Sequence, residues 1–250
     1  MSTYRIENCA GSAESARRAE LGGAYRVELC AGLPEGGTTP SYGEILTARR
    51  AISIKLNVII RPRSGDFLYT PIEVEAMLAD IRMARELGAD GIVVGCLTAD
   101  GAVDKSLLRR FVEAAEGLPV TFHRAIDVCQ DRAQALEDII EAGCARVLTS
   151  GGAASAPEGA DAIAALVKQA ADRIIIMPGA GITPENVADL ARKTGAREFH
   201  FSGRTAEPSP MRYRHEGVSM GGTVTIDEYA YLFTDPKKIR QAVEALQALE

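Results

Sequence analysis

Residues 86–95 read Glu-Leu-Gly-Ala-Asp-Gly-Ile-Val-Val-Gly, and this pattern shows how helices and strands are expected to follow one another in the chain. A helix is expected to end at Gly88, because glycine fits the left-handed conformation just past a helix end. The apolar run at 91–95 follows at once, and such a run is typical of a strand buried on both faces. The stretch therefore predicts a junction between a helix and a parallel strand.

The same junction recurs three more times, each time with a glycine two positions after a Glu or a Lys. These glycines are Gly22, Gly143 and Gly195, and strands are expected after them at 24–30, 145–149 and 197–201. The remaining strands are expected at 4–9, 54–61, 118–124 and 173–178. Together with residues 91–95, these segments make eight strands.

Eight helices alternate with these strands, at 12–21, 41–50, 71–87, 104–116, 131–142, 159–171, 184–193 and 236–249. Pro71, Pro184 and Pro236 each follow Thr or Asp, which is the pattern of an N-cap before the first helical residue. The alternation predicts a (β/α)8 TIM barrel, an α/β fold, as a single domain over residues 1–250. An open doubly wound sheet is the alternative, but residues 9–12 lack its G-x-G-x-x-G signature.

A long irregular excursion is expected over residues 203–228, just before the last helix. Connections of this length are uncommon in compact domains and are often functional. We expect this one to fold over one mouth of the barrel.

Composition and charge exclude several classes of function. The chain of 250 residues has a formal net charge of −6 and no basic stripe, which argues against a nucleic-acid partner. No apolar run approaches the ~20 residues of a membrane span, and early charges interrupt any secretory segment. The five cysteines are an odd number and lack the dense spacing of a disulfide scaffold. These features predict reduced thiols in a cytoplasmic protein without a membrane partner.

Polar side chains occupy the strand positions that should face the barrel interior, since side chains alternate along a strand. Glu7 and Cys9 share one phase of the first strand, and Glu28 and Cys30 share one phase of the second. The interior-facing positions of the other strands hold the polar residues Asn57, Arg61, Thr121, His123, Glu198 and His200, together with the apolar Ile59. Buried charges are costly unless they are paired, so mutual ion pairing is one expectation. The pairs would join Glu7, Glu28 and Glu198 to Arg61, Arg63 and Arg124. The other expectation is that the charges converge on a ligand at the C-terminal mouth.

Several segments of the chain resemble the CutC copper-homeostasis family. They are ENC at 7–9, VELC at 27–30, EGGTTPS at 35–41, IRPRSGDF at 60–67, PVTFHRA at 119–125, RVLTSG at 146–151, GAGI at 179–182 and SPMRYR at 209–214. The resemblance covers almost the whole chain, and Ser64, where the family more often has Gly, is a small departure. It implies a cytoplasmic TIM barrel that is often a homo-oligomer and is linked to copper.

The resemblance to a copper family directs attention to two thiols. Soft thiolates favour Cu(I). Cys9 and Cys30 share a phase at the ends of neighbouring strands, which lie about 4.8 Å apart. The last strand closes the barrel against the first, so His200 is a third candidate ligand. We hypothesise a Cu(I) site at Cys9 and Cys30, with His200 as a further ligand. The alternative is that both cysteines are small buried apolar residues.

A second hypothesis is an enzyme that acts on a small phosphorylated or carboxylated metabolite. Glycine-rich turns after the last three strands offer N–H groups to an anion, and arginines clamp it. The candidate anion-binding residues are Arg61, Arg63, Ser150, Gly151, Gly179, Gly181, Ser202 and Arg204. The acid–base candidates are Glu7, Glu28, Asp66 and His123. Copper binding would depend on the thiols, whereas the enzyme would depend on Arg61, Glu28 and the glycine turns.

Overall fold

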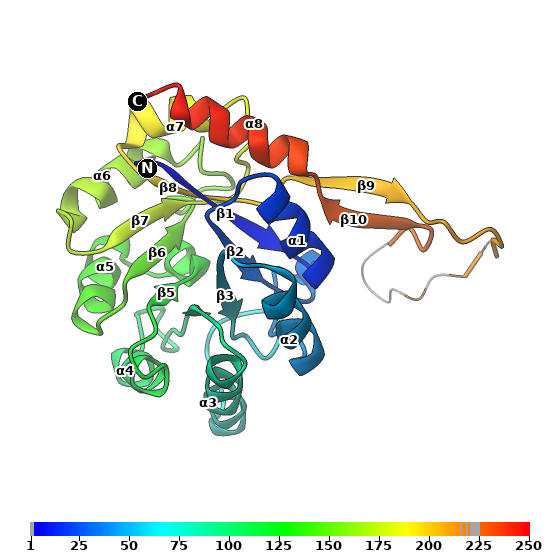
Figure 1. The fold of residues 1–250 in the computed structure, drawn as a ribbon. Helices are drawn as coiled ribbons and strands as arrows, with labels where there is room; N and C mark the ends of the chain where they lie inside the picture. The colour runs from blue at the N-terminus through cyan, green and yellow to red at the C-terminus, as the bar shows by residue number, and fades with distance from the viewer. Residues whose placement is uncertain (1–2, 216, 219, 221–225) are drawn as a thin grey trace.

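Eight short parallel strands form a barrel at the centre of the molecule (Figure 1). The strands are β1 (Arg5–Ala10), β2 (Arg26–Leu29), β3 (Lys55–Ile59), β4 (Gly91–Val94), β5 (Val120–Phe122), β6 (Arg146–Thr149), β7 (Ile175–Pro178) and β8 (Glu198–Phe201). They pair in the order β7-β6-β5-β4-β3-β2-β1-β8. The two ends of this order meet at Gly179, where an added Cβ would lie 3.2 Å from the Cβ of His200. The computed structural model describes residues 3–215, 217–218, 220 and 226–250, and it confirms the predicted barrel.

Helices surround the barrel, one after each strand (Figure 1). They are α1 (Ala13–Leu21), α2 (Tyr42–Ala51), α3 (Pro71–Glu86), α4 (Lys105–Ala114), α5 (Arg132–Glu141), α6 (Ala160–Ala170), α7 (Val187–Thr194) and α8 (Pro236–Gln247). α3 and α8 begin at a proline behind the predicted N-caps Thr70 and Asp235. The prediction for Pro184 is wrong, because the Asn186 side chain accepts the N–H of Thr183 at 2.9 Å and closes a turn ahead of α7.

The junction glycines end their helices as predicted at three of the four sites. The backbone angle φ is +86° at Gly88, +91° at Gly143 and +73° at Gly195. Gly22 is the exception, with a φ of −80°, and the left-handed residue is Gly23 instead. Gly22 serves close packing, since an added Cβ would lie 2.6 Å from the Cβ of Ile239 on α8.

Charged side chains from four strands pair inside the barrel. Glu7 contacts Arg26, and Arg26 Nη2 lies 2.6 Å from Glu198 Oε2. Arg146 Nε lies 2.7 Å from the same oxygen of Glu198. All four residues are buried. The ion network therefore occupies part of the interior, where Cys30, Ile59 and Val93 form a small apolar cluster of their own, while most other apolar strand side chains join the main core with the helices.

The arginines that were expected to pair with the interior glutamates lie elsewhere. Arg61 donates to backbone carbonyls, and Arg63 and Arg124 pair with acidic residues three positions further along the chain. All three follow the ends of their strands, so local loop groups bind them at the rim. This part of the pairing prediction is wrong.

The expected excursion over residues 203–228 is not wholly irregular, because it begins with β9 (Arg204–Pro208). The residues just after it form β10 (Ala230–Thr234), which pairs with β9 as an antiparallel hairpin. The hairpin projects away from the barrel beside α1 instead of folding over a mouth (Figure 1). Arg18 of α1 contacts both strands of the hairpin, through an ion pair with Glu207 on β9 and a contact with the ring of Phe233 on β10. Residues 216, 219 and 221–225 of the expected excursion lie outside the described residues.

Candidate functional site at the C-terminal mouth

A cavity of about 120 Å³ lies at the C-terminal mouth of the barrel. Its polar lining side chains are Cys9, Glu28, Cys30, Arg61, His123, Arg124 and His200. They converge because parallel strands end at the same edge of a barrel. The cavity thus contains the residues proposed for the metal and several of those proposed for an enzyme.

The two thiols at this mouth face each other, with 3.9 Å between Cys9 Sγ and Cys30 Sγ. A hydrogen bond from Cys30, assisted by His200, holds the pKa of the Cys9 thiol well below its usual range. The same hydrogen bond, together with burial, raises the pKa of the Cys30 thiol. The pair therefore favours a thiolate at Cys9 beside a neutral thiol at Cys30.

His200 lies between two carboxylates. Its Nδ1 is 2.9 Å from Glu7 Oε1, and its Nε2 is 3.4 Å from Glu28 Oε2. Burial alone would lower the pKa of His200, but hydrogen bonds to Cys9 and Glu7 outweigh burial and raise it well above its usual value. His200 is therefore held as an imidazolium at neutral pH.

The carboxyl group of Glu28 lies close to both the two thiols and His200. Burial raises its pKa to about 8, against the opposing effect of His200. Its Oε1 atom is buried and has no hydrogen-bond partner among the described residues. Glu28 can therefore exchange a proton near neutral pH, unlike Glu7, whose pKa Arg26 holds well below its usual range despite burial.

Two overlapping groups of side chains at this site have the spacing of metal ligands. The groups are Cys9 with Glu28 and Cys30, and Glu7 with Glu28 and His200. Within each group the ligand atoms lie within 4.8 Å of one another. Sulfur, nitrogen and oxygen donors are thus all available at one place in the barrel.

Arg63 and Asp66 do not reach the cavity. They form an ion pair with 3.0 Å between Arg63 Nη2 and Asp66 Oδ1, and the Asp66 side chain is 73% exposed. Neither residue lines the site. The pair orders the loop after β3 and is too far out on the rim to act on a molecule in the cavity.

The turn at Ser150 and Gly151 already holds a carboxylate of the protein. Asp127 accepts the N–H of Ser150 at 3.0 Å, the N–H of Gly152 at 3.1 Å and the Ser150 hydroxyl at 2.9 Å. The side chain of Thr149 accepts the N–H of Gly151 at 2.8 Å. The donors that were expected to bind an external anion are therefore used internally.

The other predicted anion-binding residues lie beside the site. Gly181, Ser202 and Arg204 line a second cavity of about 240 Å³, which shares Cys9, Arg124 and His200 with the first. Gly179 does not line either cavity, and its N–H donates to the carbonyl of Thr149 at 2.9 Å. The two cavities together make up the mouth of the barrel.

Several residues that shape the site were missed in the sequence. Arg26 and Arg146 pair with the interior glutamates, and Asp127 fills the turn after β6. The signal for Arg26 was its strand phase, which it shares with Glu28. The signal for Asp127 was its position three residues after Arg124, in a short 3-10 turn at the end of a strand.

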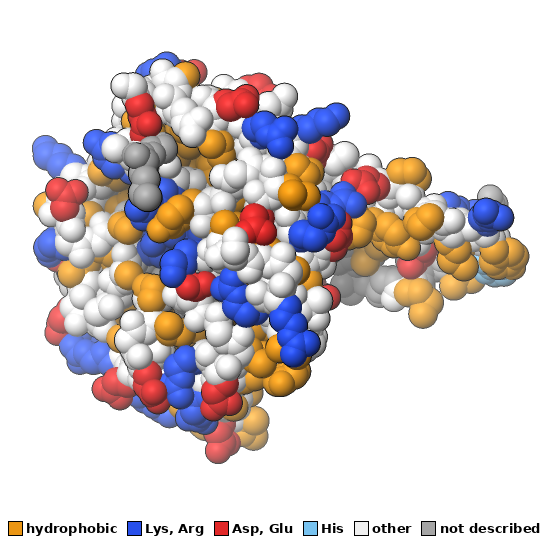
Figure 2. Space-filling model, viewed as in Figure 1, with side chains coloured by type: hydrophobic (Ala, Val, Ile, Leu, Met, Phe, Trp, Pro, Cys, Tyr) orange, Lys and Arg blue, Asp and Glu red, His pale blue; other side chains and the backbone are white. Residues whose placement is uncertain are grey.

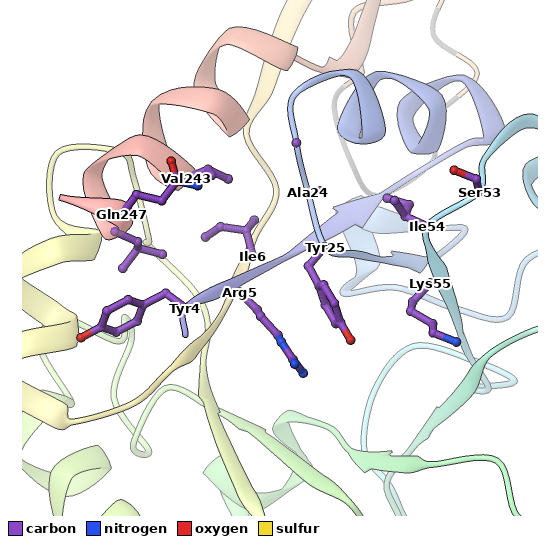
Figure 3. A pocket seen from close by; sticks show the side chains of 12 residues that line it. Tyr4, Arg5, Ile6, Ala24, Tyr25, Ser53, Ile54, Lys55, Val243 and Gln247 are labelled. Atoms are coloured by element: carbon purple, nitrogen blue, oxygen red, sulfur yellow. The ribbon is translucent and has the colours of Figure 1, made fainter. Parts of the chain in front are cut away.

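A larger cavity of about 500 Å³ lies at the opposite end of the barrel, where β1, β2 and β3 begin beside α8 (Figure 3). Arg5 lies over the ring of Tyr25 there, with 4.2 Å between the guanidinium carbon and the ring centroid. The residues that line this larger cavity include no Cys, His, Asp or Glu. Size alone would select this cavity, but the side chains with the spacing of metal ligands and the acid–base candidates Glu28 and His123 lie at the C-terminal mouth.

Comparison with known proteins identifies the family. The sequence profile described as the CutC family matches residues 4–205. This chain belongs to the CutC family. The family protein CutC of Bacteroides thetaiotaomicron is 54% identical to it over 249 residues, 99% of this chain and 100% of the relative. The human copper homeostasis protein cutC homolog is 48% identical over 237 residues, 95% of this chain and 87% of the relative.

A crystal structure of CutC from Streptococcus agalactiae has the same fold. It superimposes with a TM-score of 0.77 at 36% identity, and the match covers 80% of this chain and 98% of the other. Within the described part of this CutC-family chain, no helix is long and apolar enough to cross a membrane.

Proposed function

We propose that this chain binds Cu(I) between the thiols of Cys9 and Cys30, with His200 as a third ligand. The observation that carries the proposal is the 3.9 Å between the two sulfur atoms. A metal–thiolate bond is about 2.3 Å long, so one ion can contact both sulfurs. The copper homeostasis name of the human relative supports copper as the metal, and sulfur ligands favour its Cu(I) state.

Binding at this site requires the loss of protons. The Cys30 thiol must ionise, and His200 must become neutral before its ring nitrogen can bind a metal. Glu28 lies next to both groups and, with a pKa of about 8, is mostly protonated at neutral pH but exchanges its proton readily, so it can relay these protons to the solvent. The mouth of the barrel thus contains both the proposed ligands and a group that exchanges protons near neutral pH.

Zinc is the competing ion, because Glu28 and His200 could add an oxygen and a nitrogen ligand to the two sulfurs. The two ions differ in their needs. Cu(I) depends on the thiolates above all, whereas a tetrahedral zinc site would also need Glu28. The effect of Glu28→Gln therefore separates them.

The test is a Cu(I) titration under reducing conditions against a coloured competing chelator, repeated with Zn²⁺. Wild type should bind one Cu(I), and Cys9→Ser and Cys30→Ser should each lose that binding. Cys144→Ser is the matched control, since Cys144 packs in the apolar core. Cu(I) binding that survives both Cys9→Ser and Cys30→Ser would contradict the copper proposal. So would zinc binding that is tighter than Cu(I) binding and is lost in Glu28→Gln.

We also propose that the protein is a cytoplasmic homo-oligomer, as the family resemblance implies. The hairpin gives physical support to the oligomer, because apolar side chains gather along it (Figure 2). Met211, Tyr213, Tyr231 and Leu232 are between 43% and 67% exposed. Apolar surface of this kind on a projecting arm is typical of a protein interface.

An enzyme acting on a small metabolite is the second candidate function. A phosphorylated substrate loses support, because Asp127 occupies the donors of the turn after β6. A carboxylated substrate gains support from unpaired polar atoms in the small cavity.

A further inference from the structure

Buried polar atoms without a hydrogen-bond partner concentrate at the small cavity. Four such side-chain atoms occur in the described part of the chain, and three of them belong to residues that line it. These three are Glu28 Oε1, Arg61 Nε and His123 Nε2. Buried polar groups are nearly always paired, and an unpaired one is destabilising. Three together around one cavity make it a candidate site for a molecule that pairs with them.

His123 presents a fixed hydrogen-bond donor to this cavity. Its Nδ1 accepts the N–H of Ala125 at 3.2 Å, so the ring hydrogen of the neutral imidazole is on Nε2. Burial lowers the pKa of His123 to about 3, which keeps the ring neutral. The His123 ring is held against Gly95, where an added Cβ would lie 2.2 Å from His123 Cε1. On the Phe67 side, 4.9 Å separates the centroids of the two rings.

Arg61 supplies a second donor and a positive charge. Its two terminal nitrogens donate to the backbone carbonyls of Glu35, Gly37 and Gly65 at 2.9 to 3.1 Å. These bonds immobilise the guanidinium and leave the Nε–H without a partner. Phe67 lies beside both residues, since the guanidinium carbon of Arg61 is 5.2 Å from its ring centroid and the His123 ring centroid is 4.9 Å from it. Both donors therefore belong to residues that line the cavity next to Phe67.

The size and walls of the cavity limit what can bind. Its volume of about 120 Å³ corresponds to roughly four water molecules. This is well below the ~300 Å³ at which pockets for larger metabolites begin. Ile59, Phe67 and Leu148 supply apolar wall around the donors. A small molecule with a short chain and strongly polar groups suits this space.

We propose that the cavity binds a hydroxycarboxylate of about two or three carbon atoms. Its carboxylate accepts hydrogen bonds from His123 Nε2 and Arg61 Nε, and its hydroxyl donates to Glu28 Oε1. All three unpaired atoms are then satisfied by a single molecule. The proposal names a ligand class for the second candidate function, and it does not depend on copper binding.

The test is calorimetric titration of metal-free, reduced protein with glycolate and with lactate. A ligand this small is expected to bind with a dissociation constant between about 10 μM and about 10 mM. Propionate lacks the hydroxyl, and inorganic phosphate lacks the short chain. Propionate should bind at least about tenfold more weakly than lactate, and phosphate should not saturate the site. Equal binding of propionate and lactate, or no saturable binding of either hydroxy acid, would overturn the proposal.

Variants of His123 test the geometry. His123→Phe removes the donor and should weaken binding by about tenfold or more, whereas His123→Gln keeps an N–H donor and should recover part of the affinity. His215→Phe on the exposed hairpin is the matched control and should bind as wild type does. Circular dichroism melts identify any variant that fails to fold.

The copper titration separates this proposal from the first one. His123→Phe should retain Cu(I) binding, and Cys30→Ser should retain hydroxycarboxylate binding. If hydroxycarboxylate affinity is the same in wild type and in folded His123→Phe, the proposed ligand site is wrong even where copper binds. A wild-type protein that binds no Cu(I) but does bind a hydroxycarboxylate would contradict only the copper proposal.

Discussion

The Nδ1 atom of His200 lies 2.9 Å from the Oε1 atom of Glu7, deep in the mouth of the barrel. Glu7 is itself bound by Arg26, which reaches Glu198 at 2.6 Å. Glu198 also contacts Arg5 at 3.4 Å, at the opposite end of the barrel. A continuous line of alternating charges therefore runs through the interior and ends at the candidate metal site. Through Glu7, this line adds to the effect of the Cys9 hydrogen bond, and together they raise the pKa of His200.

Copper affinity should increase with pH. The Cys30 thiol and His200 both have raised pKa values, so both carry protons at neutral pH that a bound metal must displace. Each released proton strengthens apparent binding by roughly tenfold per pH unit, so the expected increase is about ten- to a hundredfold per unit between about pH 6 and about pH 8. Chelator competition at several pH values measures it. An affinity that does not change with pH would contradict the assignment of these ligands.

Removing the central arginine should destabilise the fold. Arg26→Met leaves the buried carboxylates of Glu7 and Glu198 without their shared partner, and breaking a buried ion pair on one side costs about 3–5 kcal/mol. Urea denaturation followed by circular dichroism measures the free energy of unfolding. Arg17→Met is the matched control, because Arg17 pairs with Glu14 on the surface and its loss should have no resolvable effect.

A methyl group at Gly95 should disturb His123. An alanine Cβ there would lie 2.2 Å from His123 Cε1, so the ring must move. We expect Gly95→Ala to lower stability by about 1–3 kcal/mol and to weaken hydroxycarboxylate binding, with Cu(I) binding unchanged. Gly43→Ala in α2 is the control, since the nearest atom to its added Cβ is 3.9 Å away and alanine favours helices. Normal ligand binding by folded Gly95→Ala would argue against a fixed role for His123.

A charge on the hairpin should disrupt the proposed oligomer. Leu232 is 57% exposed on β10, and glutamate in its place would oppose burial in an interface. Light scattering after size exclusion should give a mass above the 26.6 kDa of one chain for wild type and a lower mass for Leu232→Glu. Ile72→Glu is the control, because Ile72 is 78% exposed on α3, away from the hairpin. A wild-type protein that is monomeric would contradict the proposal.

Much of the fold followed from local sequence. The apolar strands and the glycines Gly88, Gly143 and Gly195 predicted the barrel, because helix ends and buried strands are set by short-range chemistry. Strand phase also predicted that Cys9, Glu28, Cys30 and His200 would meet at one mouth. Phase fixes the direction of a side chain once the strand is placed, so this part of the site could be read from the sequence.

The partners of the charges could not be read in the same way. Arg61 was expected to pair with a glutamate, yet it binds three loop carbonyls, and Arg26 takes the interior position instead. Asp127 was not expected to fill the turn at Ser150. Ion pairs and loop contacts join residues far apart in the chain, so their choice depends on distances that exist only after the barrel has closed.

The element order, the closed barrel and most of the polar side chains at its mouth follow from the sequence, although Arg63, Asp66 and Gly179 lie outside the cavities there. Only the folded barrel fixes which charges are neutralised, which thiol holds the proton and which buried atoms remain for a ligand. The difference lies in the range over which each interaction acts. Backbone preference and strand phase act between near neighbours, whereas burial and electrostatic pairing act across the whole interior and are set by packing.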